Sequence, residues 1–311
     1  MGARMRRKIG IANWKEIEDF IPAISLFVII DVLALLTIGP YEASGVVAFS
    51  NPNDPADIIY LFLTLLMVTL AFLLIARFWK KQLIQIIVLA SIALTVFSML
   101  FAVTATFFPE EWSLPLSITA AVILVMALVR YPEWYVVDTC GIILGAGIIG
   151  VLGISLNVFL VIILLIGLAI YDAVSVYITK HMIDLAEIVL NLKLPVMLVI
   201  PKTRNYSLIG EKRNPREKPA GNKRRKTFFV GLGDIIMPGI LVASTFHSIA
   251  SNGILVALSV MLGTIVGLIF LTRKTMKGNP QAGLPFLCSG AILGYLLSSY
   301  ILFGKLAGLF L

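Results

Sequence analysis

Long apolar runs separated by short polar segments dominate the chain. A helix needs about 20 apolar residues to cross the roughly 30 Å of hydrocarbon in a bilayer. Runs of about this length predict an all-α, polytopic membrane protein with nine transmembrane helices. The helices are expected at Phe20–Gly39, Ile58–Ala76, Leu83–Phe107, Leu114–Val129, Trp134–Leu152, Leu156–Ile178, Phe228–Phe246, Ile254–Leu271 and Leu284–Phe303.

A further apolar stretch, Ala186–Ile200, is interrupted by Asn191, Lys193 and Pro195. Polar side chains and proline are costly in a spanning helix. We therefore expect this stretch to form an interfacial or re-entrant helix.

The composition agrees with this pattern, since 59% of the 311 residues are hydrophobic and 14% are charged. These values exclude an ordinary soluble globular protein. The basic start of the chain is followed by the polar segment Ile11–Asp19, so we expect no cleaved signal peptide. Cys140 and Cys288 lie in different apolar runs, which predicts two buried thiols rather than a disulfide framework.

The distribution of Lys and Arg predicts the orientation, because positively charged loops stay on the cytoplasmic side. The segment before the first span carries five Lys or Arg residues, whereas the next loop, Pro40–Asp57, carries none. The alternation continues along the chain, with Lys305 in the tail as the exception. We expect a cytoplasmic N-terminus and an external C-terminus.

The loop 201–227 contains ten Lys or Arg residues and two Glu. It divides the chain into an N-terminal part (1–200), a basic cytoplasmic loop (201–227) and a C-terminal part (228–311). Basic segments beside a membrane bind anionic lipid head groups. Because the loop lacks aromatic interleaving and any known nucleic-acid module, we expect lipid and no nucleic acid as its partner.

Four aspartates fall in or at the predicted spans: Asp31, Asp138, Asp172 and Asp234. A charged side chain at the centre of a spanning helix costs about 2.5–3.5 kcal/mol, so such residues are functional candidates. Asp172 precedes the end of the sixth span by about six residues, and Asp234 follows the start of the seventh by about six, which places both roughly 9 Å from the cytoplasmic boundary. On consecutive antiparallel helices the two carboxyl groups can face each other, whereas Asp31 and Asp138 lie at other depths.

Two carboxyl groups in a site of low dielectric share one proton and titrate as a unit. Such a pair supplies a base and an acid together, as aspartic proteases require. The same pair could serve as a proton relay in a transporter or channel, or hold helices together as a scaffold. Gly231, Gly233 and Pro238 favour a site that something approaches closely, because glycine and proline loosen a helix beside Asp234.

Three short motifs resemble those of the presenilin and signal peptide peptidase family of intramembrane aspartyl proteases. Tyr171-Asp172 resembles its YD motif, Gly231-Leu232-Gly233-Asp234 its GxGD motif, and Ala282-Gly283-Leu284-Pro285 its PAL motif. The family pattern at the third motif reads Pro-Ala-Leu-Pro, so this chain keeps only the last two residues. The order of the motifs, their spans and the predicted orientation are similar to those of presenilin.

The resemblance implies that Asp172 and Asp234 are the catalytic dyad. It also implies that eight residues support the site: Tyr171, Gly231, Leu232, Gly233, Ala282, Gly283, Leu284 and Pro285. It further implies single-span membrane proteins as substrates, and the short chain looks like a prokaryotic, archaeal homologue in the plasma membrane. Neither a metal nor a cofactor is expected, since the chain has no HExxH motif and its two histidines, His181 and His247, fall on opposite sides of the predicted membrane.

The sequence therefore predicts an intramembrane aspartyl endopeptidase in which the dyad activates water. Its main alternative is a proton- or cation-coupled transporter that uses the same two aspartates. A substrate helix must unwind before its amides can be attacked, and the loosened backbone near Asp234 and Gly283 could receive it as an added strand.

Overall fold

The computed structural model describes residues 21–49, 51–78, 81–179, 197–201, 227–275 and 281–309. The basic N-terminal segment, most of the stretch Ala186–Ile200 and nearly all of the basic loop lie outside the described residues. Predictions about these segments therefore stay predictions.

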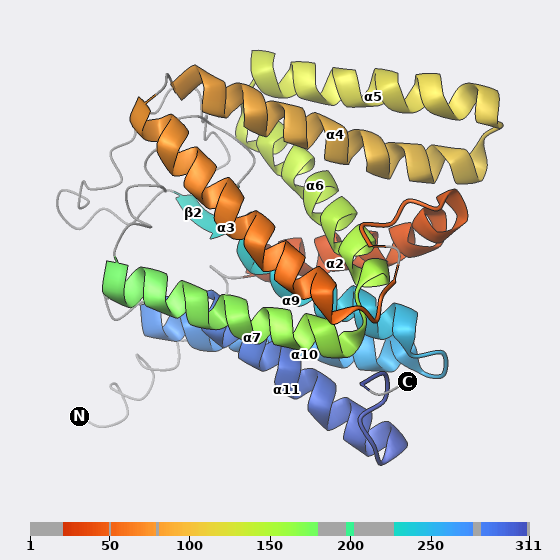
Figure 1. Cartoon of the computed structure of the whole chain (residues 1–311), viewed down its shortest axis with the longest axis vertical. Helices are drawn as coiled ribbons and strands as arrows, with labels where there is room; N and C mark the ends of the chain where they lie inside the picture. Colours follow the sequence, from red (N-terminus) through yellow and green to blue (C-terminus); the bar gives the residue numbers. More distant parts are fainter. Residues whose placement is uncertain are drawn as a thin grey trace, which may run out of the picture.

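Each predicted span coincides with one helix of the structure (Figure 1). The helices are α2 (Ile21–Ser44), α3 (Pro55–Phe78), α4 (Lys81–Phe107), α5 (Glu110–Arg130), α6 (Trp134–Ser155), α7 (Val158–Val174), α9 (Leu232–Ser248), α10 (Gly253–Thr275) and α11 (Leu284–Phe303). Within the described residues, seven helices are long and apolar enough to cross a membrane, and Pro55–Val68 and Leu232–Ser248 are shorter apolar helices. The protein is therefore an integral, multi-pass membrane protein, while the count of nine spans and the orientation stay predictions.

The described residues are mostly helical, as predicted, but they also include a two-stranded antiparallel sheet that the all-α prediction lacked. Strand β1 (Met197–Pro201) pairs with β2 (Thr227–Gly231), and the register runs from Met197 opposite Gly231 to Pro201 opposite Thr227. The end of the stretch Ala186–Ile200 is thus a strand rather than a helix, and the seventh helix begins at Leu232 rather than at Phe228. Threonine, phenylalanine and valine fit a pleated strand well, which explains why 227–230 are extended although they are as apolar as the helix that follows.

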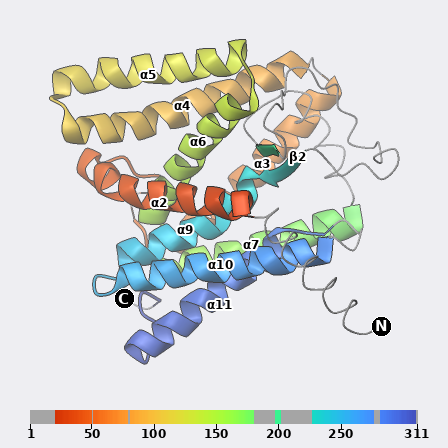
Figure 2. The same cartoon turned by 180° about the vertical axis from the view of Figure 1, so that it is seen from behind.

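Helix α9 lies at the centre of the bundle. It contacts α2, α6, α7, α10 and α11, and Figure 2 shows it between α2 and α10. Most of its residues from Leu232 to Thr245 are buried. The paired helices α4 and α5 lie at one edge of the molecule, beside α6. The helix that carries Asp234 is therefore held on several sides by other helices.

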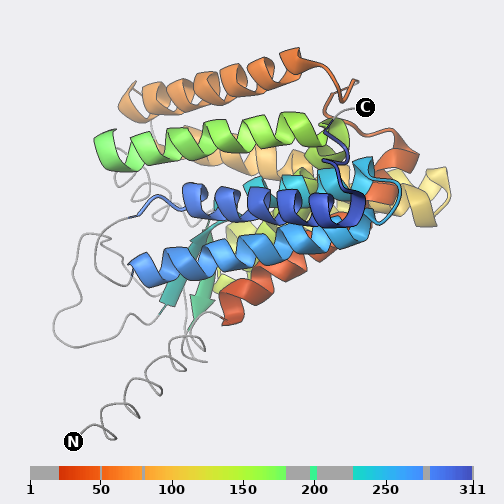
Figure 3. The same ribbon diagram turned by 90° about the horizontal axis from the view of Figure 1, so that it is seen from below.

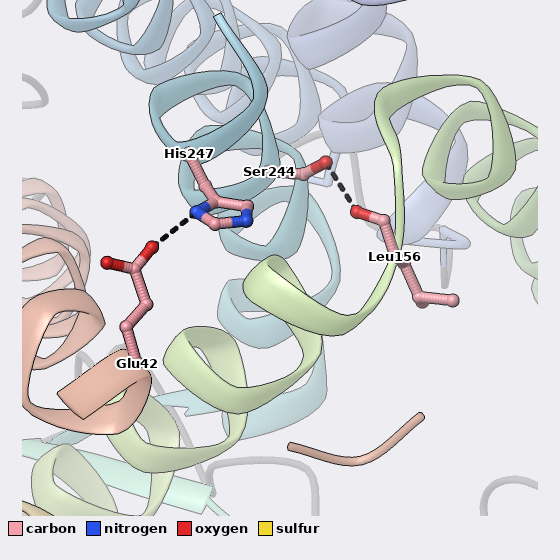
Figure 4. Close-up of polar contacts among 4 residues, drawn as sticks. All are labelled: Glu42, Leu156, Ser244 and His247. Atoms are coloured by element: carbon pink, nitrogen blue, oxygen red, sulfur yellow. Dashed lines mark hydrogen bonds and ion pairs between the residues drawn. The ribbon is translucent and has the colours of Figure 1, made fainter. Parts of the chain in front are cut away.

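Two polar contacts fix the C-terminal end of α9 (Figure 4). The Ser244 hydroxyl donates to the carbonyl of Leu156, in the connection between α6 and α7, at 2.8 Å. His247 Nδ1 lies 2.7 Å from Glu42 Oε1 on α2. The end of α9 opposite Asp234 is thereby tied to two other parts of the bundle.

Glycines bring the backbones of α10 and α11 into direct contact. A Cβ added at Gly263 would meet the carbonyl oxygen of Gly290, and one added at Gly290 would meet the carbonyl oxygen of Gly263. Gly267 and Gly294, one turn further along their helices, are equally close to the facing backbone. Small residues four apart on each helix permit this kind of close packing between membrane helices. The start of α11 is therefore fixed relative to α10.

We predict that Gly290→Leu destabilises the protein strongly, because the side chain would have to push the two backbones apart. Overpacking of this kind costs about 1–3 kcal/mol or more. Thermal unfolding in detergent measures the loss. Gly39→Leu on α2 is the matched control, since a Cβ there meets nothing within 4 Å; equal melting temperatures for the two variants would contradict the packing argument.

Candidate active site

Asp172 lies in the last turn of α7 and is buried, with 4% of its surface exposed. A π-helical turn, Ser175–Thr179, follows directly. The Asp172 Oδ2 atom accepts a hydrogen bond of 3.1 Å from the backbone N–H of Leu284, the first residue of α11. The first N–H groups of a helix have no partner within the helix, so the start of α11 provides a donor for this carboxyl group.

Asp234 lies in the first turn of α9, directly after strand β2. Gly231 ends the strand and also caps the helix. A carboxylate in the first turn of a helix is favoured by the helix dipole. The prediction that Asp234 lies about six helical residues inside its span is wrong, because 228–231 are extended. Asp234 is the third residue of α9, which begins at Leu232.

The segment Gly283-Leu284 brings the two aspartates together. Leu284 bonds Asp172, and a Cβ built at Gly283 would lie 2.9 Å from Asp234 Oδ2. The carboxyl groups of Asp172 and Asp234 are close enough to interact electrostatically. Figure 3 shows the strands, the end of α7 and the start of α11 at the same end of the bundle. Residues far apart in sequence thus form one site.

Comparison with known proteins decides the family. The sequence model described as "Signal-peptide peptidase, presenilin aspartyl protease" matches residues 24–304. The chain belongs to this family. The membership confirms the predicted resemblance and the class of enzyme, an aspartic endopeptidase, and nothing in the comparisons supports the transporter alternative.

Solved structures of a presenilin family intramembrane aspartate protease resemble the chain. The structure in the C222 space group is 31% identical, with a TM-score of 0.68 over 89% of this chain and 97% of the other. The structure in the P2 space group is 32% identical, with a TM-score of 0.66 over 90% and 97%. No curated protein matches the chain.

The residues predicted to support this presenilin-family site occupy different environments. Leu232 and Ala282 are buried, whereas Gly233 is exposed and a Cβ there would meet nothing within 4 Å. Pro285 lies in the first turn of α11, where its missing N–H costs no helical hydrogen bond. Tyr171 is 48% exposed, and among the described residues its hydroxyl makes no hydrogen bond to either carboxyl group.

Two contacts near the site had no clear signal in the sequence. Cys288, one turn after Leu284, is a free, buried cysteine, as predicted, and lies close enough to Asp172 and Asp234 to interact with both. The Tyr177 hydroxyl, in the π-helical turn, donates to Gln281 Oε1 at 3.0 Å. This second contact ties the end of α7 to the segment that precedes α11.

The other two aspartates lie outside the pair. Asp31 on α2 is buried, its Oδ1 has no hydrogen-bond partner among the described residues, and a Cβ built at Gly239 of α9 would lie 2.7 Å from that atom. Asp138 on α6 accepts a hydrogen bond from Val199 in β1. Among the described residues, no group of three His, Cys, Asp or Glu side chains could hold a metal ion.

We predict that Gly283→Ala lowers kcat severalfold, because the added methyl group makes the end of the Asp234 side chain shift and small misplacements in a catalytic site are costly. The backbone of Gly283 is at φ −80° and ψ −50°, which alanine adopts freely, so the melting temperature should hardly change. Gly39→Ala adds the same methyl group on α2, where a Cβ meets nothing within 4 Å, and should keep the wild-type kcat. Full activity of Gly283→Ala would mean that the carboxyl group shifts without consequence.

Proposed function

We propose that the protein is an intramembrane endopeptidase whose catalytic dyad is Asp172 and Asp234. The observation that carries the proposal is that both carboxyl groups lie beside one backbone segment, Gly283-Leu284, at the start of α11. Its substrates are single-span membrane proteins. Anionic lipids bind the basic loop 201–227, and the enzyme resides in the plasma membrane of a prokaryote.

The two carboxyl groups perform the hydrolysis as one acid and one base. The ionised member takes a proton from water, whose oxygen attacks the peptide carbonyl carbon, while the protonated member donates its proton to the carbonyl oxygen. Collapse of the tetrahedral intermediate breaks the C–N bond: the leaving amine takes the proton that the base removed from water, and a hydroxyl group of the intermediate returns its proton to the other carboxyl group, which restores the starting pair. The Leu284 N–H orients the Asp172 carboxyl group throughout.

Strand β2 supports the idea that the substrate binds as an added strand. The Val199 N–H points to Asp138 and therefore away from β2. In an antiparallel pair, residues opposite each other either both point their backbone N–H and C=O groups at the partner strand or both point them away, and the two cases alternate along the strand. Phe229 lies opposite Val199, so its backbone groups point away from β1, and the same holds for Gly231, two positions further along β2. A substrate paired with this edge of β2 is carried towards Asp234, which follows Gly231 by three residues.

We predict that Asp172→Asn and Asp234→Asn each reduce cleavage of a single-span substrate by at least about a thousandfold, and that the double variant is no worse, because the acids act as a unit. Mass spectrometry of the products from purified protein in detergent measures the loss. Glu111→Gln, at an exposed position on α5, is the control for removing one charge.

Since only the singly protonated pair is active, kcat/KM of the wild type should fall on both sides of a pH optimum.

Substantial cleavage by either single variant would contradict the dyad. If the wild type cleaves nothing but carries protons or cations across liposome membranes, and the two variants do not, the transporter alternative replaces the proposal.

We predict that blocking single amides of the substrate affects binding with a period of two residues. N-methylation removes a donor, which matters where the substrate amide faces β2 and not at the next position, where it points away. A series of peptides, each methylated at one position around the scissile bond, should give inhibition constants that alternate between weak and strong. Constants that show no alternation would contradict strand pairing.

A further inference from the structure

Asp138 is a buried carboxyl group outside the candidate dyad. It lies in the second turn of α6, with 8% of its surface exposed. Its Oδ1 accepts a hydrogen bond of 2.8 Å from the Val199 N–H in β1, 61 residues along the chain. A carboxyl group inside a spanning helix is costly and is commonly retained for function. The partner of this carboxyl group is a backbone N–H of the two-stranded sheet.

Strand β1 joins two apolar clusters. Val199 belongs to an apolar cluster with side chains of α4, α5 and α6, among them Val96, Leu128 and Cys140. Its neighbours Leu198 and Ile200 belong to the main cluster around α9. The hydrogen bond to Asp138 therefore fixes the strand at the boundary between these clusters, with one face directed to each.

The same bond occupies the outer edge of β1. Every two-stranded sheet has two edges, and each presents unpaired N–H and C=O groups on which another strand can pair. On β1 the central donor of that edge, the Val199 N–H, is taken by Asp138. On β2 the edge at Phe229 and Gly231 has no such carboxyl partner among the described residues, and it continues directly into Asp234.

We propose that Asp138 is a positioning residue for proteolysis: it fixes β1 and closes the outer edge of the sheet, so that a substrate strand pairs with β2 and its scissile bond reaches the dyad. This inference rests on the proposed function. According to this inference, Asp138 on α6 determines which edge of the sheet the substrate strand can pair with. It thereby also determines the register in which the substrate lies across Asp172 and Asp234.

Asp138→Ala tests the proposal in the full-length protein with a single-span substrate in detergent. Leaving the buried Val199 N–H without an acceptor should raise KM about 10- to 100-fold, with a smaller effect on kcat, and the set of cut positions should broaden. Asp138→Asn keeps an acceptor oxygen and should restore most of the KM and the original cut positions. Thr139→Ala is the matched control on the same turn, because the Thr139 hydroxyl donates to the Tyr135 carbonyl of its own helix.

Val199→Pro removes the donor instead of the acceptor. Proline is acceptable at a strand position whose N–H does not pair with the neighbouring strand. The variant should reproduce the rise in KM, and combining it with Asp138→Ala should add nothing, because both changes break one bond. If Asp138→Ala does not fold, Val199→Pro alone still tests the proposal, because it breaks the same hydrogen bond from the other side and a wild-type KM with unchanged cut positions would then overturn the role of Asp138.

The proposal is overturned if Asp138→Ala keeps the wild-type KM and cut positions, or if the effects of the two substitutions add. It is also overturned if kcat and melting temperature fall together and Asp138→Asn restores neither, since a purely structural role predicts that result. Asp172→Asn in the same assay separates the two proposals: an active Asp172→Asn refutes the dyad, whereas an inactive one beside an unaffected Asp138→Ala refutes only the role of Asp138.

Discussion

Keeping carboxyl groups inside an apolar protein interior is the constraint on which the rest of the structure depends. A buried polar group without a partner costs roughly 1–3 kcal/mol, and lipid supplies no partners. The protein meets this demand with backbone N–H groups that the secondary structure leaves unpaired. Leu284 provides one at the start of α11, and Val199 provides another at the edge of β1. Only Asp31 retains a buried oxygen without a partner among the described residues.

Those backbone donors are useful only if the elements that carry them stay in place. Glycine contacts fix α11 against α10, and the polar contacts of Ser244 and His247 fix the far end of α9. The sheet fixes the near end, because β2 passes into α9 at Gly231 without an intervening loop. The position of Asp234 is therefore determined by packing on both sides of the residue.

The sequence predicted the helices, the family and the pair of candidate acids because each has a local signal. Apolar runs mark the spans, and Asp172 and Asp234 stand out within them. The strand 227–231 was missed because it is apolar and merges with α9 in any hydropathy pattern. The contacts of Asp138 and Asp172 could not be predicted, since their partners are backbone groups 61 and 112 residues away. The glycines four apart in α10 and α11 did carry a readable signal for close helix packing.

Because Leu284 acts through its main chain, the contact with Asp172 does not depend on which side chain the residue carries. Any non-proline residue that preserves the start of α11 can donate the same hydrogen bond. For this hydrogen bond the departure of Ala282-Gly283 from the family's Pro-Ala pattern is tolerable, because the bond needs only the backbone. At Gly283 itself the side chain does matter, since a Cβ there would lie 2.9 Å from Asp234 Oδ2. Sequence searches that require fixed residues at every position of this motif will therefore miss chains that retain the geometry. A helix that begins opposite a buried acid is the better criterion for recognising distant members of the family.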